Sequence, residues 1–384
     1  MSSQRLYRRG DTGPAVAEIR SKLAMLGLLP TGQAVDADSL ESAVFDDQAD
    51  RAVRCFQQQR AITVDGVVGP QTYRLLDEAR WRLGDRILSY TVSHMMIGDD
   101  VAQLQKRLLD MGFHSGRVDG IFGPDTEQGL REFQRNVGLT VDGTCGPGTF
   151  KALGRLARTV VGGRPHAMRE SEIIHRSGPA LPGKVVVVDP GHGGSDRGTA
   201  SGDLNEASVV WDLASRVEGR LTATGVQAYL TRGVDGELDE VARAEFANTT
   251  AADLVISLHV DAHHSPAASG VSAYYYGNDR FGHHSAVGEK FAGLAQREIV
   301  ARTDLVNCRT HAKTWDLLRR TRMPAVRIEL GYITNPGDAA RLASADFRDH
   351  VAEAIVVAVQ RLYLPPEEDA PTGMLKLPQL IGQQ

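Results

Sequence analysis

The chain has 384 residues, a formal net charge of −5 at pH 7, 42% hydrophobic residues and 24% charged residues. This balance is ordinary for a globular protein, and the lack of any basic run argues against a nucleic-acid partner. The three cysteines lie far apart without a CxxC pair, which argues against a disulfide framework and against a thiolate metal site. At roughly 100–200 residues per domain, the length predicts two or three domains.

The N-terminus lacks the apolar core of roughly 7–15 residues that a secretory signal requires. The longest apolar runs, such as AIVVAV at 354–359, are too short to span a bilayer. We therefore expect a cytoplasmic protein without a membrane span.

The N-terminal part of the chain repeats itself. FQQQRAITVDGVVGPQTYRLL at 56–76 and FQRNVGLTVDGTCGPGTFKAL at 133–153 share ten identities at an offset of 77 residues. Apolar residues at helical spacing over 101–112, and again over 126–139, predict helices, while VDGxxGPxT predicts a loop that leads into a short helix. The sequence therefore predicts two related small all-α units, at 10–82 and 91–157.

These units resemble the three-helix peptidoglycan-binding domain, above all in FQxxxxLxVDGxxGPxT. The resemblance implies a shallow groove for a muropeptide and no catalysis. The alternative is that the Asp and Gly residues of the loop serve only as turn formers, which we favour for the glycines.

Residues 158–183 mix Gly, Pro and charge without a period and predict a linker. From 184 to 364, β-branched runs alternate with helical patterns, which predicts an α/β domain with a mostly parallel sheet covered on both faces. The expected strands are 185–189, 226–231, 254–259, 272–277 and 325–330, and the expected helices lie near 206–224, 238–250, 284–302 and 345–362. The Pro-rich, acidic tail at 365–384 is expected to be mobile.

Candidate site residues follow the expected strands of this domain. His192 comes after VVVVDPG, His259 ends LVISLH and Glu329 ends AVRIEL, while Glu206 begins the helix after the first loop. In open α/β sheets, ligands bind beyond the carboxyl ends of the strands. Two imidazoles and a carboxylate suit catalytic zinc, and a further carboxylate can move the proton of the attacking water. Spacing alone does not decide between this zinc site and structural roles for the same residues. Glu206, for example, could simply be an acidic residue at a helix N-terminus.

Two further features of DPGHGGSDRGT bear on this site. The glycines are expected to let the backbone approach metal and substrate closely. Asp189 is expected either to orient the loop or to accept the N–H of a ligand imidazole.

DPGHGGSDRG, LNEASVV, SLHVDA and PAVRIELGYITNP resemble, in order, the motifs of the zinc-dependent N-acetylmuramoyl-L-alanine amidase family. The resemblance implies that His192, Glu206 and His259 bind Zn²⁺ and that Glu329 is catalytic. It also implies hydrolysis of the amide between the muramyl lactyl group and L-alanine.

The sequence departs from the family pattern in three places. Asp261 stands where asparagine is usual, Tyr332 where phenylalanine is usual, and Ala207 where a charged residue is common. Asp261 adds negative charge beside the metal and is expected to lower activity. Asp189, Asp261 and Arg243 are the candidates for residues that support the ligands or contact substrate. His263 and His264 are expected to be exposed loop residues rather than competing ligands.

A second function stays open. Two N-terminal repeats before an amidase-like domain without a signal resemble a group of actinobacterial amidase-family proteins. A cytoplasmic protein of this kind would bind muropeptides and regulate an enzyme of peptidoglycan precursor synthesis. Thr372 in the tail would then be a phosphosite for a Ser/Thr kinase, against the alternative of an idle tail residue.

Overall fold

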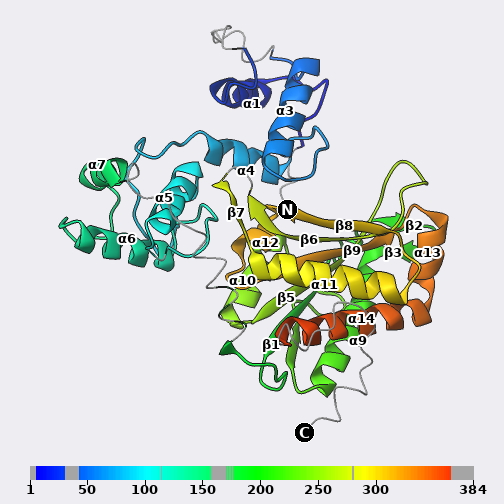
Figure 1. The fold of residues 1–384 in the computed structure, drawn as a ribbon. Coiled ribbons are helices and arrows are strands. Elements are labelled where there is room, and N and C mark those ends of the chain that lie inside the picture. Colours follow the sequence, from blue (N-terminus) through cyan, green and yellow to red (C-terminus); the bar gives the residue numbers. More distant parts are fainter. Residues whose placement is uncertain are drawn as a thin grey trace. The chain divides into compact units, whose positions relative to one another are not determined.

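The computed structural model describes residues 6–30, 43–113, 115–156, 170, 172, 174, 176–278 and 281–364. The chain divides into two compact units (Figure 1). One unit comprises Met1–His166 with Asn278–His283, and the other comprises Ala167–Gly277 with His284–Gln384. Thr372 lies outside the described residues.

In the described residues, each repeat of the first unit contains three helices, as the sequence predicts (blue to green in Figure 1). The first repeat contains α1 (Pro14–Met25), α3 (Asp47–Gln59) and α4 (Pro70–Ala79). The second contains α5 (Asp99–Asp110), α6 (Pro124–Asn136) and α7 (Pro147–Leu156). The Gly-Pro pairs of the repeated motif start helices, because proline has its φ already set for a first helical turn and needs no N–H partner there.

A buried glutamine fastens each VDGxxGPxT loop to the preceding helix. In the first repeat, Gln57 Nε2 donates to Asp65 Oδ1 at 2.7 Å and to Thr72 Oγ1 at 3.2 Å. Gln134 makes the same pair of bonds to the aspartate and threonine of its loop. These side chains therefore hold the loop together, so the Asp and Thr of the motif have a structural role besides the turn-forming glycines.

The structure reveals a third copy of this arrangement, which the sequence analysis missed. Gln105 Nε2 donates to Asp119 Oδ1 at 2.8 Å and to Thr126 Oγ1 at 3.0 Å, within VDGIFGPDT. The second repeat is thus built from two successive helix–loop segments of the same design.

The second unit has a central mixed sheet with the strand order β4-β1-β5-β9-β6-β7, and β8 pairs with β6. Its main strands are β1 (Val185–Pro190), β4 (Gln227–Leu230), β5 (Leu254–Asp261), β6 (Val271–Asn278), β7 (His283–His284), β8 (Asn307–Lys313) and β9 (Ala325–Tyr332). β4, β1, β5 and β9 are parallel, whereas β6 is antiparallel to β9. The predicted mostly parallel α/β domain is confirmed. Strand β8 and the short β2 (Ala200–Ser201)–β3 (Leu204–Asn205) pair were not predicted.

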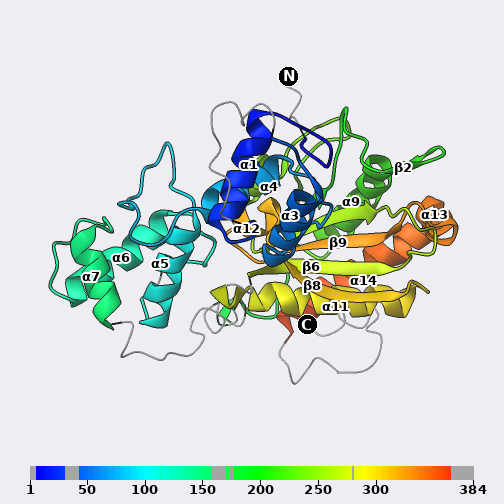
Figure 2. The ribbon, with the colours of Figure 1, turned by 90° about the horizontal axis from the view of Figure 1, so that it is seen from above.

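Helices cover both faces of this sheet (Figure 2). The main core joins one face to the long helices α9 (Glu206–Ala223), α11 (Ala286–Arg302) and α14 (Ala345–Tyr363). The smaller cluster on the other face includes Val187 and Val255 with residues of α10 (Glu240–Thr249) and α12 (Asp316–Arg320). Helix α13 (Pro336–Ala343) follows β9. Alternate valines of β1 enter opposite clusters, which explains the uninterrupted VVVV run.

The stretch expected to be a linker has helical residues at its C-terminal side. Ile174 is buried in the main core, and Glu170 accepts hydrogen bonds from Ser285 Oγ at 2.6 Å and from the backbone N–H of Val287 at 3.0 Å. This part of 158–183 therefore packs onto the second unit. Across the chain segments that the structure describes, no helix is both long and apolar enough to cross a membrane.

Candidate metal centre and active site

The site lies at the carboxyl ends of the parallel strands β1, β5 and β9. In the register of β5 and β9, His259 lies directly beside Glu329, and Asp189 of β1 lies beside Ser257 of β5. The loop after β1 carries His192, and Glu206 opens α9. The strands therefore bring together His192, Glu206, His259 and Glu329 from positions up to 137 residues apart.

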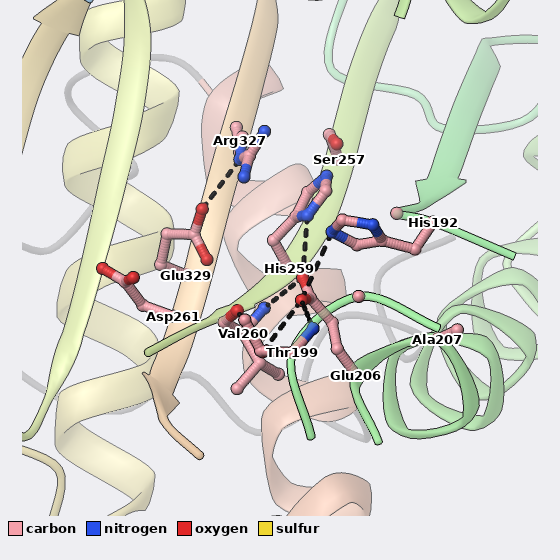
Figure 3. A network of polar contacts seen from close by, with 12 residues as sticks. His192, Thr199, Glu206, Ala207, Ser257, His259, Val260, Asp261, Arg327 and Glu329 are labelled. Atoms are coloured by element: carbon pink, nitrogen blue, oxygen red, sulfur yellow. Dashed lines mark hydrogen bonds and ion pairs between the residues drawn. The ribbon is translucent and has the colours of Figure 1, made fainter. Parts of the chain in front are cut away.

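Three of these side chains form a cluster with metal-ligand geometry (Figure 3). His192 Nε2 lies 3.3 Å from Glu206 Oε2, and His259 Nδ1 lies 2.9 Å from Glu206 Oε1. One nitrogen of each ring and a carboxylate oxygen all lie within 4.8 Å of one another. Two imidazole nitrogens and one oxygen at this spacing fit a tetrahedral cation that keeps one position open. His263 and His264 are exposed and are not part of this cluster.

Glu206 is buried and surrounded by hydrogen-bond donors. Oε1 accepts from the backbone N–H of Val260 at 3.0 Å, and Oε2 accepts from the backbone N–H and the hydroxyl of Thr199, each at 3.0 Å. Burial alone would raise the pKa of this carboxyl, but the two imidazoles hold it far below its usual value. Glu206 is therefore ionised and held in place at neutral pH, as a carboxylate that binds a metal ion needs to be.

His192 is held by a neighbour that the sequence analysis missed. Its Nδ1 lies 2.7 Å from Asp196 Oδ2, which leaves Nε2 to face the cluster. Burial lowers the pKa of His192, but its hydrogen bonds to Glu206 and Asp196 outweigh burial and raise it overall. An imidazole partner was one of the two roles expected for Asp189. Asp196, four positions after His192 in the same motif, has that place instead.

His259 is buried, and burial, followed by the nearby charge of Arg327, lowers its pKa to about 4. The ring is therefore neutral near pH 7, as a metal ligand must be.

Asp189 and Arg243 support the loop. Asp189 accepts hydrogen bonds from Thr231 Oγ1, Arg243 Nη1 and Ser257 Oγ, each at 2.6 Å. Arg243 also donates to the backbone carbonyls of Pro190 at 2.6 Å and His192 at 2.7 Å. Of the two roles expected for Asp189, the structure shows loop orientation.

Arg232, which the sequence analysis did not single out, donates to the carbonyls of Pro190 and Gly191, each at 2.9 Å. The only sequence signal was its place in the TRG segment beside Thr231. Together Arg232 and Arg243 hold His192 at φ +54°, a backbone conformation that non-glycine residues rarely adopt.

The glycines around His192 make room for the ligands themselves. A Cβ on Gly191 would lie 2.2 Å from His259 Cε1, and one on Gly198 would lie 2.6 Å from Glu206 Oε2. The glycines were expected to let the backbone approach metal and substrate, but the space beside them is filled by the side chains of His259 and Glu206.

Glu329 is only 5% exposed. Its Oε1 accepts from Arg327 Nε at 2.8 Å, whereas Oε2 has no hydrogen-bond partner among the described residues (Figure 3). Burial, together with the charges of Glu206 and Asp261, raises the pKa of Glu329 to about 7, although Arg327 lowers it. A carboxylate with a free oxygen and a pKa near neutrality can accept and return a proton.

Asp261 follows a bulge in β5 and pairs in register with Tyr332. Its Oδ1 accepts from the backbone N–H of Ala262 at 2.7 Å. Burial and the charge of Asp261 raise the pKa of Tyr332. Ala207 contributes its backbone carbonyl, which accepts from Arg232 Nη2 at 3.2 Å.

Two family models and a full-length relative match the chain. Residues 186–361 match the family model for N-acetylmuramoyl-L-alanine amidase, and residues 12–76 and 97–153 match that for a peptidoglycan binding domain. The chain is 47% identical, over 98% of its length and 94% of the relative's, to the N-acetylmuramoyl-L-alanine amidase CwlM of Mycobacterium tuberculosis.

Two further relatives match about half of the chain. A germination-specific N-acetylmuramoyl-L-alanine amidase of Bacillus subtilis is 32% identical over 49% of this chain and 84% of its own. The structure of amidase AmiC2 of Nostoc punctiforme is 33% identical, covers 46% of this chain and 94% of its own, and gives a TM-score of 0.43. On the full-length match and the two domain assignments, the chain belongs to the N-acetylmuramoyl-L-alanine amidase family.

Proposed function

We propose that the protein is a Zn²⁺-dependent N-acetylmuramoyl-L-alanine amidase that hydrolyses the amide between the lactyl group of muramic acid and L-alanine. The observation that carries this proposal is the pairing of a three-residue cluster with the buried carboxylate of Glu329, whose Oε2 has no hydrogen-bond partner in the described part of the chain. The two kinds of group are what metal-assisted amide hydrolysis requires.

The donor set fits zinc. Two imidazole nitrogens and one carboxylate oxygen form a common catalytic zinc set, and His192 has a carboxylate partner on its other nitrogen. Zn²⁺ held by His192, Glu206 and His259 would polarise the scissile carbonyl and make the attacking water more acidic.

Glu329 supplies the proton transfers. Because Oε1 is occupied by Arg327, Oε2 is the atom that takes the proton of the attacking water. The same atom then gives the proton to the leaving amine of L-alanine. The fixed ligand Glu206 keeps its charge through the cycle, since its pKa is held far below neutrality.

The repeats would hold the enzyme on its polymer. Tethering raises the local concentration of substrate, so each repeat needs only a weak affinity for a muropeptide.

The test is an assay of purified, zinc-loaded protein on defined muropeptides, with release of free stem peptide followed by mass spectrometry. Glu329→Gln is the matched control, because it keeps the shape of the side chain and removes the base. Release by the wild type alone would support the proposal. Lack of release by the fully zinc-loaded wild type would refute it.

A second candidate is a cytoplasmic, non-lytic regulator that binds muropeptides or precursors together with an enzyme of peptidoglycan precursor synthesis. Asp261 favours this second candidate. Its negative charge helps to raise the pKa of Glu329, so a smaller fraction of Glu329 is ionised and able to act as a base at neutral pH. In this case Thr372 would be phosphorylated by a Ser/Thr kinase. Unchanged partner binding in Thr372→Ala would rule out that switch.

A further inference from the structure

Arg327 is an unusual residue for its place in the fold. It lies in β9 two positions before Glu329, so both side chains emerge on the same face of the sheet. Arginine is rarely buried unless it is paired, yet only a fifth of this side chain is exposed.

Three contacts fix the guanidinium of Arg327. Nε donates to Glu329 Oε1 at 2.8 Å, and Nη1 donates to Glu240 Oε1 at 3.3 Å. The guanidinium carbon lies 4.6 Å from the ring centroid of Trp315, which suits a cation–π contact. Trp315 in turn packs against Tyr274, with ring centroids 4.8 Å apart.

The supports come from separate elements. Glu240 begins α10 and also accepts from the backbone N–H of Leu317 in α12, at 3.3 Å. Trp315 precedes α12, and Tyr274 lies beside Arg327 in the register of β6 and β9. Arg327 is therefore held from several sides before any substrate arrives, which is what preorganisation requires.

This arrangement has one consequence for Glu329. Arg327 is its only hydrogen-bond partner in the described part of the chain, so this single bond sets the rotation of the carboxylate. It engages Oε1 and leaves Oε2 as the free atom. Without Arg327, neither oxygen of a buried carboxylate would have a partner, and the group would turn towards any donor within reach.

We propose that Arg327 is a positioning residue for Glu329, and that it holds the carboxylate so that Oε2 faces the reacting water. The inference rests on the proposed amidase function. Arg327 acts through Glu329 and needs no contact with substrate.

The test is steady-state kinetics of zinc-loaded Arg327→Leu and Arg327→Lys on one defined muropeptide, with zinc content measured in parallel. We expect Arg327→Leu to lower kcat by about 10- to 100-fold and to leave KM within about twofold, since misplacing a reacting group has effects of this size. Arg327→Lys should regain part of kcat, because an ammonium restores the charge and one donor. Zinc content should match the wild type, because Arg327 contacts none of the three ligands by hydrogen bond.

Arg216→Leu is the matched control. Arg216 is a half-buried arginine of α9 that pairs with Asp212 and Asp349, so its loss removes a comparable ion-pair network away from Glu329. Its kcat should equal that of the wild type. If Arg327→Leu does not fold, Glu240→Gln tests the same idea by weakening the support of Arg327, and kcat should fall by a smaller factor at unchanged KM.

The outcomes separate the two proposals. A wild type that releases no stem peptide refutes the amidase function, and the role of Arg327 falls with it. An active wild type with equally active Arg327→Leu, or Glu240→Gln where the former does not fold, overturns the positioning role alone. Loss of zinc together with kcat would also overturn it, because the residue would then be structural.

Discussion

Glu206 and Glu329 are two buried carboxylates at one site in opposite environments. Glu206 accepts three hydrogen bonds from Val260 and Thr199 and lies against two imidazoles, and its pKa is held far below the usual value. Among the residues that the structure describes, Glu329 has Arg327 as its one hydrogen-bond partner, and burial raises its pKa to about 7. The comparison teaches that the groups facing a buried carboxylate, here two imidazoles against one guanidinium, decide whether it serves as a permanent charge or as a proton carrier.

The largest effect is expected from Glu206→Gln. An amide in this place loses the ligand charge and sets its NH₂ group against the N–H donors of Thr199 or Val260. Zinc affinity should fall by at least about 100-fold, and amidase activity should be lost with it. Metal analysis after dialysis measures this, and a variant that keeps stoichiometric zinc would break the assignment of Glu206 as a ligand.

Asp196→Asn tests the other end of the ligand cluster. The substitution weakens the bond that holds His192 Nδ1, so zinc affinity should fall by about 10- to 100-fold while the fold stays intact. Competition with a chelator of known affinity gives the value. Asp203→Asn, an exposed aspartate in the turn between β2 and β3, is the control and should bind zinc like the wild type.

The pH dependence of activity separates the two carboxylates further. Glu329 must be ionised to accept a proton, so activity should rise with pH up to about 7, with a slope of about tenfold per pH unit on the acid side. Bound zinc would move this limb to lower pH, since a nearby cation favours the carboxylate. A pH–rate profile without an acid limb over the whole range in which the protein keeps its fold and its zinc would contradict the role of Glu329.

Stability of the metal-free protein should change with pH in the opposite sense. The pKa of Glu329 in the folded state is raised above its ordinary value of 4.5. Its contribution to the free energy of unfolding is therefore complete below pH 4.5, and it is lost as pH rises through about 7. The loss is at most about 3 kcal/mol. Denaturant unfolding at pH 5 and 8 should show it in the wild type and not in Glu329→Gln.

The smallest effect is expected from Asp261→Asn. Removing this charge lowers the pKa of Glu329, so the acid limb should move to lower pH and activity at pH 6 should rise by about two- to fivefold. Unchanged or reduced activity at pH 6 would show that Asp261 contributes in another way.

The sequence predicted the parts of the site that depend on strand ends. His192, His259 and Glu329 each follow an apolar run, and parallel strands carry such positions to one edge. It did not predict Asp196, Arg232 or the Arg327–Glu329 pair. Arg232 donates to backbone carbonyls, and the residue types of a sequence do not show which carbonyls need a donor. Arg327 lies within the apolar pattern AVRIEL, which predicts a strand but not an ion pair with Glu329.

The fold, like the site, was predicted where it depends on regular apolar patterns and missed where it does not. Periodicity predicted the helices of both repeats and the parallel strands, because each buries a regular apolar face. Edge strand β8, with its sequence NCRTHAK, has no such face and was missed. The role of Gln105 was missed because Asp119 lies 14 residues away in a loop and Thr126 lies 21 residues away in the first turn of α6.

The central claim is that the ligand and the base are different carboxylates. The most direct measurement is zinc stoichiometry and muropeptide turnover on the same preparation of Glu329→Gln. We expect one equivalent of zinc, as in the wild type, with turnover reduced by about 10²- to 10⁴-fold. Loss of zinc together with turnover would contradict it, because Glu329 would then belong to the metal site.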